Sequence, residues 1–122
     1  MTAKDAYSKY NNNRVNSASQ AELVLMLYDG CIKFCNMSKM YIENKDYENA
    51  NIYIKKAQRI VEEFKFTLNH KYETAKDFDI IYDYILQTLI EANVKKDTAL
   101  IDKALEHLRD MREIWIKITK KK

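Results

Sequence analysis

The sequence predicts an all-α fold, an antiparallel up-down-up-down four-helix bundle with a mobile N-terminal arm. Its 122 residues include one glycine and no proline, although sheet proteins of this size need both for their tight turns. Apolar residues recur at alternating spacings of three and four along four segments, each about 20 residues long. The links between these segments are short and polar, which favours antiparallel neighbours.

The first 16 residues form the arm, because three consecutive asparagines, residues 11–13, compete with helix formation. The arm also contains Tyr7 and Tyr10, which a purely solvated tail does not require. A capping box then predicts the first helix, with Ser19 as N-cap and Glu22 three residues later. The chain therefore divides into an arm at 1–16, a helical bundle at 17–119 and a basic tail at 120–122.

An apolar stripe along the first helix is expected to form its seam with the bundle; its members are Leu23, Leu27, Gly30, Phe34, Met37 and Tyr41. Gly30 costs about 1 kcal/mol relative to alanine inside a helix, so it indicates close approach of another helix or chain. Cys31 and Cys35 are four residues apart, a spacing that suits a disulfide poorly. We expect them to be reduced thiols in the core.

Three further helices follow from the same periodicity. The second starts after the cap Asp46, and its apolar positions run from Tyr47 to Leu68. The third extends over residues 77–96, after a stretch in which no apolar period holds. The fourth begins after the cap Asp97.

The third helix has more apolar surface than a bundle helix needs, because apolar residues also fall opposite its core face. The second helix shows a milder excess. Together they predict a partner-binding groove formed by Ile52, Tyr53, Ile60, Ile80, Tyr84, Ile90, Asn93 and Val94. The alternative is an ordinary surface, since isolated exposed apolar residues are common. Asn93 is either a satisfied polar group of the bundle or a contact for a partner backbone.

The sequence contains no candidate catalytic or metal site. Neither His70 nor His107 has a glutamate three residues before it, as di-iron bundles require. A single glycine excludes glycine-rich phosphate loops, and no cofactor is expected. The enzyme-like alternative is a histidine phosphotransfer bundle acting through His107, although Glu106 and Asp110 would repel a phosphoryl group. Without that function, His107 is expected to be a solvated surface residue.

Charge and hydropathy narrow the range of partners. The net charge is +3, but the lysines are scattered between carboxylates, so nucleic-acid binding is only a third, weaker hypothesis. No stretch approaches the roughly 20 apolar residues of a membrane span, and the first residues lack the apolar segment of a secretory signal. We therefore expect a cytoplasmic protein that does not insert into a membrane.

The segment 17–30, which reads SASQAELVLMLYDG, together with Tyr7 and Tyr10 ahead of it, resembles the FliS family of flagellin export chaperones. The resemblance continues through DYENAN at 46–51 and LIEAN at 89–93, and covers nearly the whole chain. The sequence departs from the family at Gln20, where a helix-starting proline is common. The loop that follows the second helix also lacks the usual glycine.

This resemblance implies a cytoplasmic helical bundle without catalytic activity. Such a protein binds the C-terminal, helix-forming segment of flagellin, prevents premature polymerisation and assists export. Tyr7 and Tyr10 would then correspond to the family's N-terminal tyrosine motif, which covers the groove and can be displaced by flagellin. The flagellar export gate and, for the free protein, a second copy of the chain are further candidate partners.

Overall fold

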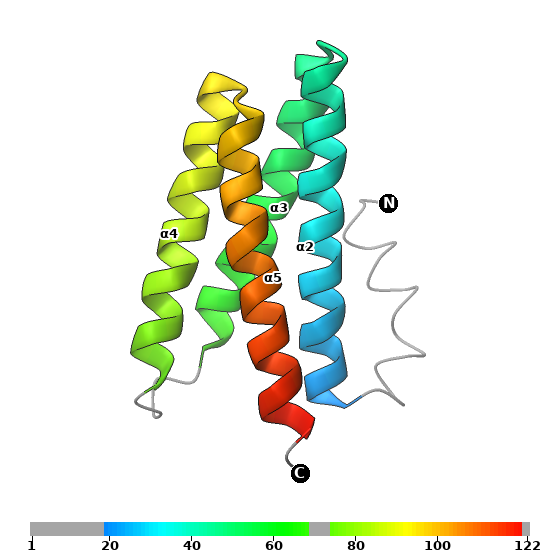
Figure 1. Ribbon diagram of the computed structural model, residues 1–122. Coiled ribbons are helices and arrows are strands. Elements are labelled where there is room, and N and C mark those ends of the chain that lie inside the picture. The colour runs from blue at the N-terminus through cyan, green and yellow to red at the C-terminus, as the bar shows by residue number, and fades with distance from the viewer. Residues whose placement is uncertain (1–18, 69–73, 121–122) are drawn as a thin grey trace.

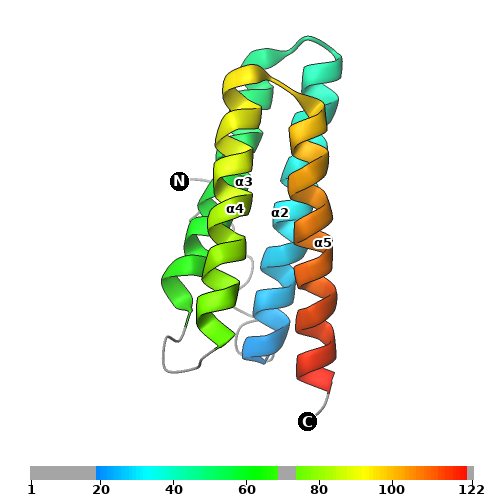
Figure 2. The same cartoon turned by 60° about the vertical axis from the view of Figure 1, so that its left-hand side comes forward.

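The computed structural model describes residues 19–68 and 74–120, which form four helices. These are α2 (Gln20–Glu43), α3 (Tyr47–Thr67), α4 (Thr74–Lys95) and α5 (Thr98–Lys120). The helices lie side by side and alternate in direction, as Figure 1 shows, so the predicted bundle is confirmed. α2 and α4 each pack against both α3 and α5, which makes a four-cornered bundle (Figure 2). The arm, with Tyr7 and Tyr10, lies outside the described residues.

The helix starts follow the predicted caps. The Ser19 hydroxyl accepts a hydrogen bond from the Glu22 amide at 3.2 Å, one of the two bonds of the capping box. The Asp46 carboxylate likewise caps α3, and the Asp97 carboxylate accepts from the Ala99 amide at 2.9 Å. α4 starts at Thr74, three residues earlier than predicted, because its first turn buries Ala75. α5 continues through Lys120, where the tail was expected to begin.

Two turns of the same kind join α2 to α3 and α4 to α5 at one end of the bundle (Figure 1). Lys45 and Lys96 adopt positive φ angles of 61° and 50°. The amide that follows each lysine reaches back five residues, from Asp46 to the Tyr41 carbonyl at 2.8 Å and from Asp97 to Ala92 at 3.1 Å. These bonds terminate each helix with a left-handed residue and hold both hairpins tightly.

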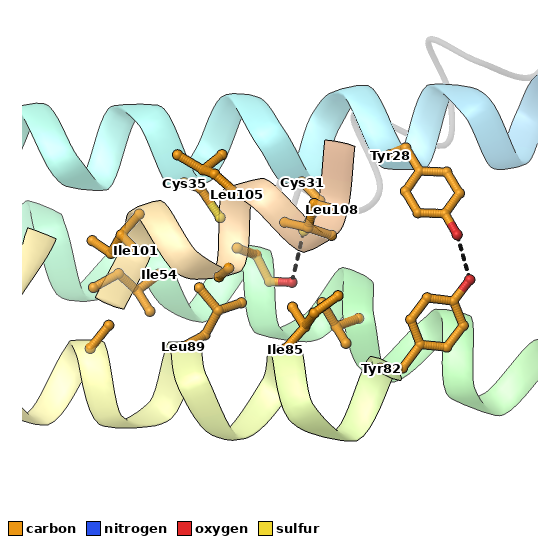
Figure 3. Packing of buried hydrophobic residues seen from close by; sticks show 14 of the residues in the cluster. Tyr28, Cys31, Cys35, Ile54, Tyr82, Ile85, Leu89, Ile101, Leu105 and Leu108 are labelled. Carbon is orange, nitrogen blue, oxygen red and sulfur yellow. Dashed lines mark hydrogen bonds between the residues drawn. The ribbon is translucent and has the colours of Figure 1, made fainter. Parts of the chain in front are cut away.

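The core runs along the bundle axis and is contributed by all four helices (Figure 3). Its largest fully buried aliphatic side chains are Ile54, Val61, Ile85, Leu89, Ile101, Leu105 and Leu108. Cys31 and Cys35 are free thiols with no exposed surface, as predicted. The Cys31 thiol points at the Ala57 carbonyl of α3, with the sulfur 3.5 Å from the oxygen.

The predicted core stripe of α2 is wrong by one residue. The residues of α2 that are buried are Tyr28, Cys31, Cys35, Ser38 and Ile42. Leu23, Leu27, Gly30, Phe34, Met37 and Tyr41, which we call the α2 stripe, are only half-buried, and all but Leu23 directly precede a buried residue. The small, less apolar Cys31, Cys35 and Ser38 are the residues of α2 that have no exposed surface. Phe34 and Tyr41 of the stripe contact Tyr53 of α3.

A buried tyrosine pair closes one end of the core. The hydroxyls of Tyr28 and Tyr82 are 2.5 Å apart and hydrogen-bonded (Figure 3). The Phe64 ring packs against both tyrosine rings. Burial, helped by the neighbouring Tyr82, raises the pKa of Tyr28 far above its usual range. Burial also raises the pKa of Tyr82, although its hydrogen bond to Tyr28 acts in the opposite direction. Each phenol therefore stays protonated, and each hydroxyl is the hydrogen-bond partner of the other.

Removing one hydroxyl of this pair is expected to destabilise the protein more than removing both. Tyr28→Phe leaves the Tyr82 hydroxyl buried and unpaired, which costs about 1–3 kcal/mol of unfolding free energy. Tyr28→Phe combined with Tyr82→Phe should recover part of that loss, as a double-mutant cycle in urea would measure. Tyr41→Phe, at a half-buried tyrosine, is the matched control. Single-variant losses that simply add would contradict the pairing.

The same pair also makes a pH-dependent contribution. Both folded pKa values are raised, so the unfolded chain ionises first as the pH rises past about 10. The free energy of unfolding that the buried neutral phenols contribute is therefore present in full below that pH and decreases above it. The double phenylalanine variant should show a smaller loss.

Candidate functional site

The surface of the bundle carries apolar side chains on two opposite seams and ion pairs on the other two. Lys39 bonds Asp102 at 2.8 Å and Arg112 bonds Asp29 at 2.7 Å across the α2/α5 seam. Lys65 of α3 bridges two carboxylates of α4 on the α3/α4 seam. Such exposed pairs are worth at most about 1 kcal/mol each. The α2/α3 and α4/α5 seams are therefore the candidate binding surfaces.

The α4/α5 seam contains a shallow hollow of about 340 Å³, lined by Ile80, Ile81, Tyr84 and His107, which we call the α4/α5 hollow. Ile80 and Tyr84 are 67% and 46% exposed, unusually open for large apolar side chains. Ile114 and Ile118 lie about two and three helical turns beyond His107 on the same side of α5, and both are exposed. They extend the apolar surface towards the end of α5.

His107 is part of this hollow. The expectation that it is a solvated surface residue is therefore wrong. Its ring is half-buried and meets the Tyr84 ring edge-on, with the centroids 5.0 Å apart and the planes at 75°. Ile80 and Ile81 complete its surroundings. An apolar setting of this kind suits contact with an apolar ligand better than acceptance of a phosphoryl group, whose charge would be desolvated.

The α2/α3 seam is formed by the α2 stripe and the residues of α3 that face it. Tyr53 stacks on Tyr41 with ring centroids 5.5 Å apart, and lies 5.9 Å from the Phe34 ring. The Lys56 ammonium sits over the same aromatic group, 4.8 Å from the Tyr53 centroid and 5.6 Å from that of Phe34. Tyr53 therefore packs towards α2 and not towards α4.

The α3/α4 seam is polar where the groove was expected. Asn93 donates a hydrogen bond to the Asn51 side-chain oxygen at 2.7 Å, and the Lys96 ammonium donates to the Asn93 side chain at 2.9 Å. Of the two roles left open by the sequence, Asn93 is thus a satisfied polar group of the bundle. The Asp83 and Asp79 carboxylates on this seam raise the pKa of Lys65, mainly through the hydrogen bond from Lys65 to Asp83.

The residues of the predicted groove do not meet in one place. Tyr53 and Ile60 lie on the α2/α3 seam, Asn93 on the α3/α4 seam, and Ile80 and Tyr84 in the α4/α5 hollow. Ile52, Ile90 and Val94 are exposed, and Val94 is 80% open. The sequence prediction missed Ile81, Ile114 and Ile118. The four-residue spacing of Ile114 and Ile118 beside the core positions of α5 was the available signal.

Residues 19–68 and 74–120 contain neither a cluster of metal-ligating side chains nor a helix that could span a membrane. No group of three or more histidine, cysteine, aspartate or glutamate side chains comes together there as a metal site would require. None of the described helices has the length and hydropathy needed to cross a membrane.

Comparison with known proteins identifies one family. The model of the family described as flagellar protein FliS matches residues 3–122 of this chain. The flagellar secretion chaperone FliS of Bacillus subtilis strain 168 is 39% identical over 115 residues, which cover 94% of this chain and 86% of that protein. The chaperone of the same name from Campylobacter jejuni is 29% identical over 112 residues, covering 90% and 88% of the two chains.

A solved structure supports the fold independently. The crystal structure of a bacterial flagellar chaperone superposes with a TM-score of 0.79 and covers 99% of this chain and 100% of that one. Its sequence identity is 18%, so the agreement concerns the arrangement of the helices.

Proposed function

The chain belongs to the FliS family, whose curated relatives are flagellar secretion chaperones, and from this membership we propose that its client is the C-terminal helical segment of flagellin. The protein binds that segment in the cytoplasm before export and keeps flagellin from polymerising early. It acts by binding and not by catalysis. Delivery to the export gate follows from the same role.

The observation that carries this proposal is the exposed apolar surface around the α4/α5 hollow. Ile80, Tyr84 and Ile118 leave large apolar areas in contact with water, although the core of the bundle is closed without them. An amphipathic helix gains free energy by burying its own apolar face on such a surface. Flagellin ends polymerise through apolar helical faces. The bound chaperone would cover those faces, so they could not contact another flagellin subunit.

Calorimetric titration with a flagellin C-terminal fragment tests the proposal directly. We expect saturable binding at micromolar concentrations or below, with a negative heat-capacity change because apolar surface is buried. In parallel, the full chain should delay flagellin polymerisation measured by light scattering. A flagellin fragment that lacks the C-terminal segment is the control. Absence of saturable binding would overturn the proposed function.

Residues 1–16 are expected to compete with the client, as part of the same proposal. Tyr7 and Tyr10 are three residues apart, so one helical turn would bring both rings to the same apolar surface. A covered surface lowers the apparent affinity by the fraction of molecules that are closed. Deleting residues 1–16, or replacing both tyrosines by alanine, should therefore tighten client binding or increase dimerisation, measured by calorimetry and sedimentation. Weaker binding without added dimer would show instead that the arm contacts the client.

A further inference from the structure

The α4/α5 hollow contains a side chain whose charge can change in the physiological pH range. Histidine is the residue that ordinarily gains its proton between pH 5 and 8, and this chain has two, His70 and His107. His107 lines the hollow beside two isoleucines and Tyr84. Its ring is half-buried and contacts the Tyr84 ring. A proton on His107 therefore places a positive charge directly against the apolar surface of the hollow.

The charged neighbours of His107 on its own helix are all exposed. Lys103 and Asp110 lie one turn before and one turn after it on the same side of α5, and Glu106 precedes it directly. Within the part of the chain that the structure describes, no ion pair joins His107 to a carboxylate. Exposed charges without a direct contact are screened by water and salt, so they influence the imidazole only weakly.

α4 also brings no carboxylate into contact with His107. Asp83 is bonded to Lys65 on the α3/α4 seam, and Glu91 is bonded to Lys95 of its own helix. Asp77 is exposed, one turn before the isoleucines of the hollow. The titratable group of α4 that touches the imidazole is the phenol of Tyr84.

α2, the other helix packed against α5, meets a different face of that helix. Its charged residues Asp29 and Lys39 are bonded to Arg112 and Asp102. His107 is five residues from each of these two α5 residues, which turns it about 140° away from them around the helix. The described bundle therefore supplies no counter-ion in the hollow, and an imidazolium there is stabilised mainly by water.

A client helix laid over the hollow would remove that water. Burial of a charged group without a partner costs much more free energy than burial of the neutral group. The neutral imidazole is therefore the form that a covering apolar helix would accept, and a protonated His107 would have to lose its proton before the client could bind.

We propose that His107 makes client binding pH-dependent, with the flagellin segment bound while the imidazole is neutral and released when the imidazole gains a proton. The inference rests on the proposed function, because it assigns a regulation to that same site. Below about pH 6.5, where imidazole ordinarily becomes protonated, each binding event displaces a proton from His107. The affinity then falls by up to about tenfold for each further unit of pH.

Calorimetric titration of the full chain with the flagellin C-terminal fragment, at pH 7.5 and at pH 5.5, tests the inference. We expect binding about tenfold weaker at pH 5.5. His107→Phe keeps an aromatic ring beside Tyr84 but cannot gain a proton, so this difference should disappear. His70→Phe removes the other histidine and is the matched control, which should keep the tenfold difference. Thermal unfolding at both pH values checks that each variant is folded.

Proton release provides a second readout that does not depend on affinity. Titrations at pH 5.5 in two buffers of different ionisation enthalpy give the number of protons released for each client bound. The unaltered protein should release about one proton more than His107→Phe. Titratable groups of the client contribute equally in both proteins, so the difference belongs to His107.

The outcomes distinguish this inference from the proposed function. If the unaltered protein binds the fragment at neither pH, the proposed function fails and this inference fails with it. If it binds equally well at both pH values, or if His107→Phe keeps the same pH dependence, only the inference is overturned. Tighter binding at pH 5.5 would mean that the imidazolium pairs with a carboxylate of the client, and this result would also contradict the inference.

Discussion

Replacing Ile80 by aspartate is expected to weaken binding of the flagellin segment by at least about 100-fold, with the free protein as stable as before. Ile80 is 67% exposed, so a carboxylate there stays hydrated in the free chain and changes stability by no more than about 0.5 kcal/mol. A client helix that covers the α4/α5 hollow would bury the same carboxylate without a partner. That burial costs several kcal/mol, and each 1.4 kcal/mol is a tenfold loss of affinity.

Calorimetry for the affinity and thermal unfolding for the stability would measure both halves of this expectation. Asn36→Asp introduces the same charge on α2, away from both apolar seams, and is the matched control. Ile90→Asp and Val94→Asp extend the test, since both residues belong to the groove predicted from the sequence. Losses in all three α4 variants would mean that the client covers the whole outer face of α4. Unchanged affinity in Ile80→Asp would exclude the α4/α5 hollow as the client site.

Replacing Leu89 by alanine is expected to lower the unfolding free energy by about 2–5 kcal/mol. Leu89 has no exposed surface and lies in the centre of the core, facing side chains of the neighbouring helices (Figure 3). The removed atoms lose their contacts, and the cavity that remains can close only partly because the interior is densely packed. Urea unfolding measures the loss as a shift of the midpoint at unchanged slope.

Val94→Ala is the control for this core variant. Val94 is on the same helix and 80% exposed, so the same kind of truncation should cost less than about 0.5 kcal/mol. Similar losses at the two positions would mean that α4 is rotated relative to the arrangement described here. Leu89→Ala protein that remains folded should still bind the flagellin segment, because Leu89 does not reach the surface.

The sequence alone determined the local features of this fold. The side-chain caps Ser19, Asp46 and Asp97 mark three helix starts, because capping involves only residues within one turn. The buried residues of α3 also follow from periodicity, since its apolar positions from Ala50 to Phe64 recur at alternating spacings of four and three. Family membership likewise follows from motifs within the sequence, and the comparisons confirm it.

Only the tertiary structure decided how each helix is rotated about its own axis. In α2 two adjacent stripes are apolar, and the sequence favoured the one with larger side chains. The fold buries the other, which carries Cys31 and Cys35, and the Cys31 thiol lies against the Ala57 carbonyl of α3. The same rotations carry Tyr53 to α2, Tyr84 to His107 and Asn93 to Asn51, and so divide the predicted groove. A helical wheel gives angles within one helix, whereas the facing of two helices depends on side chains far apart in the chain.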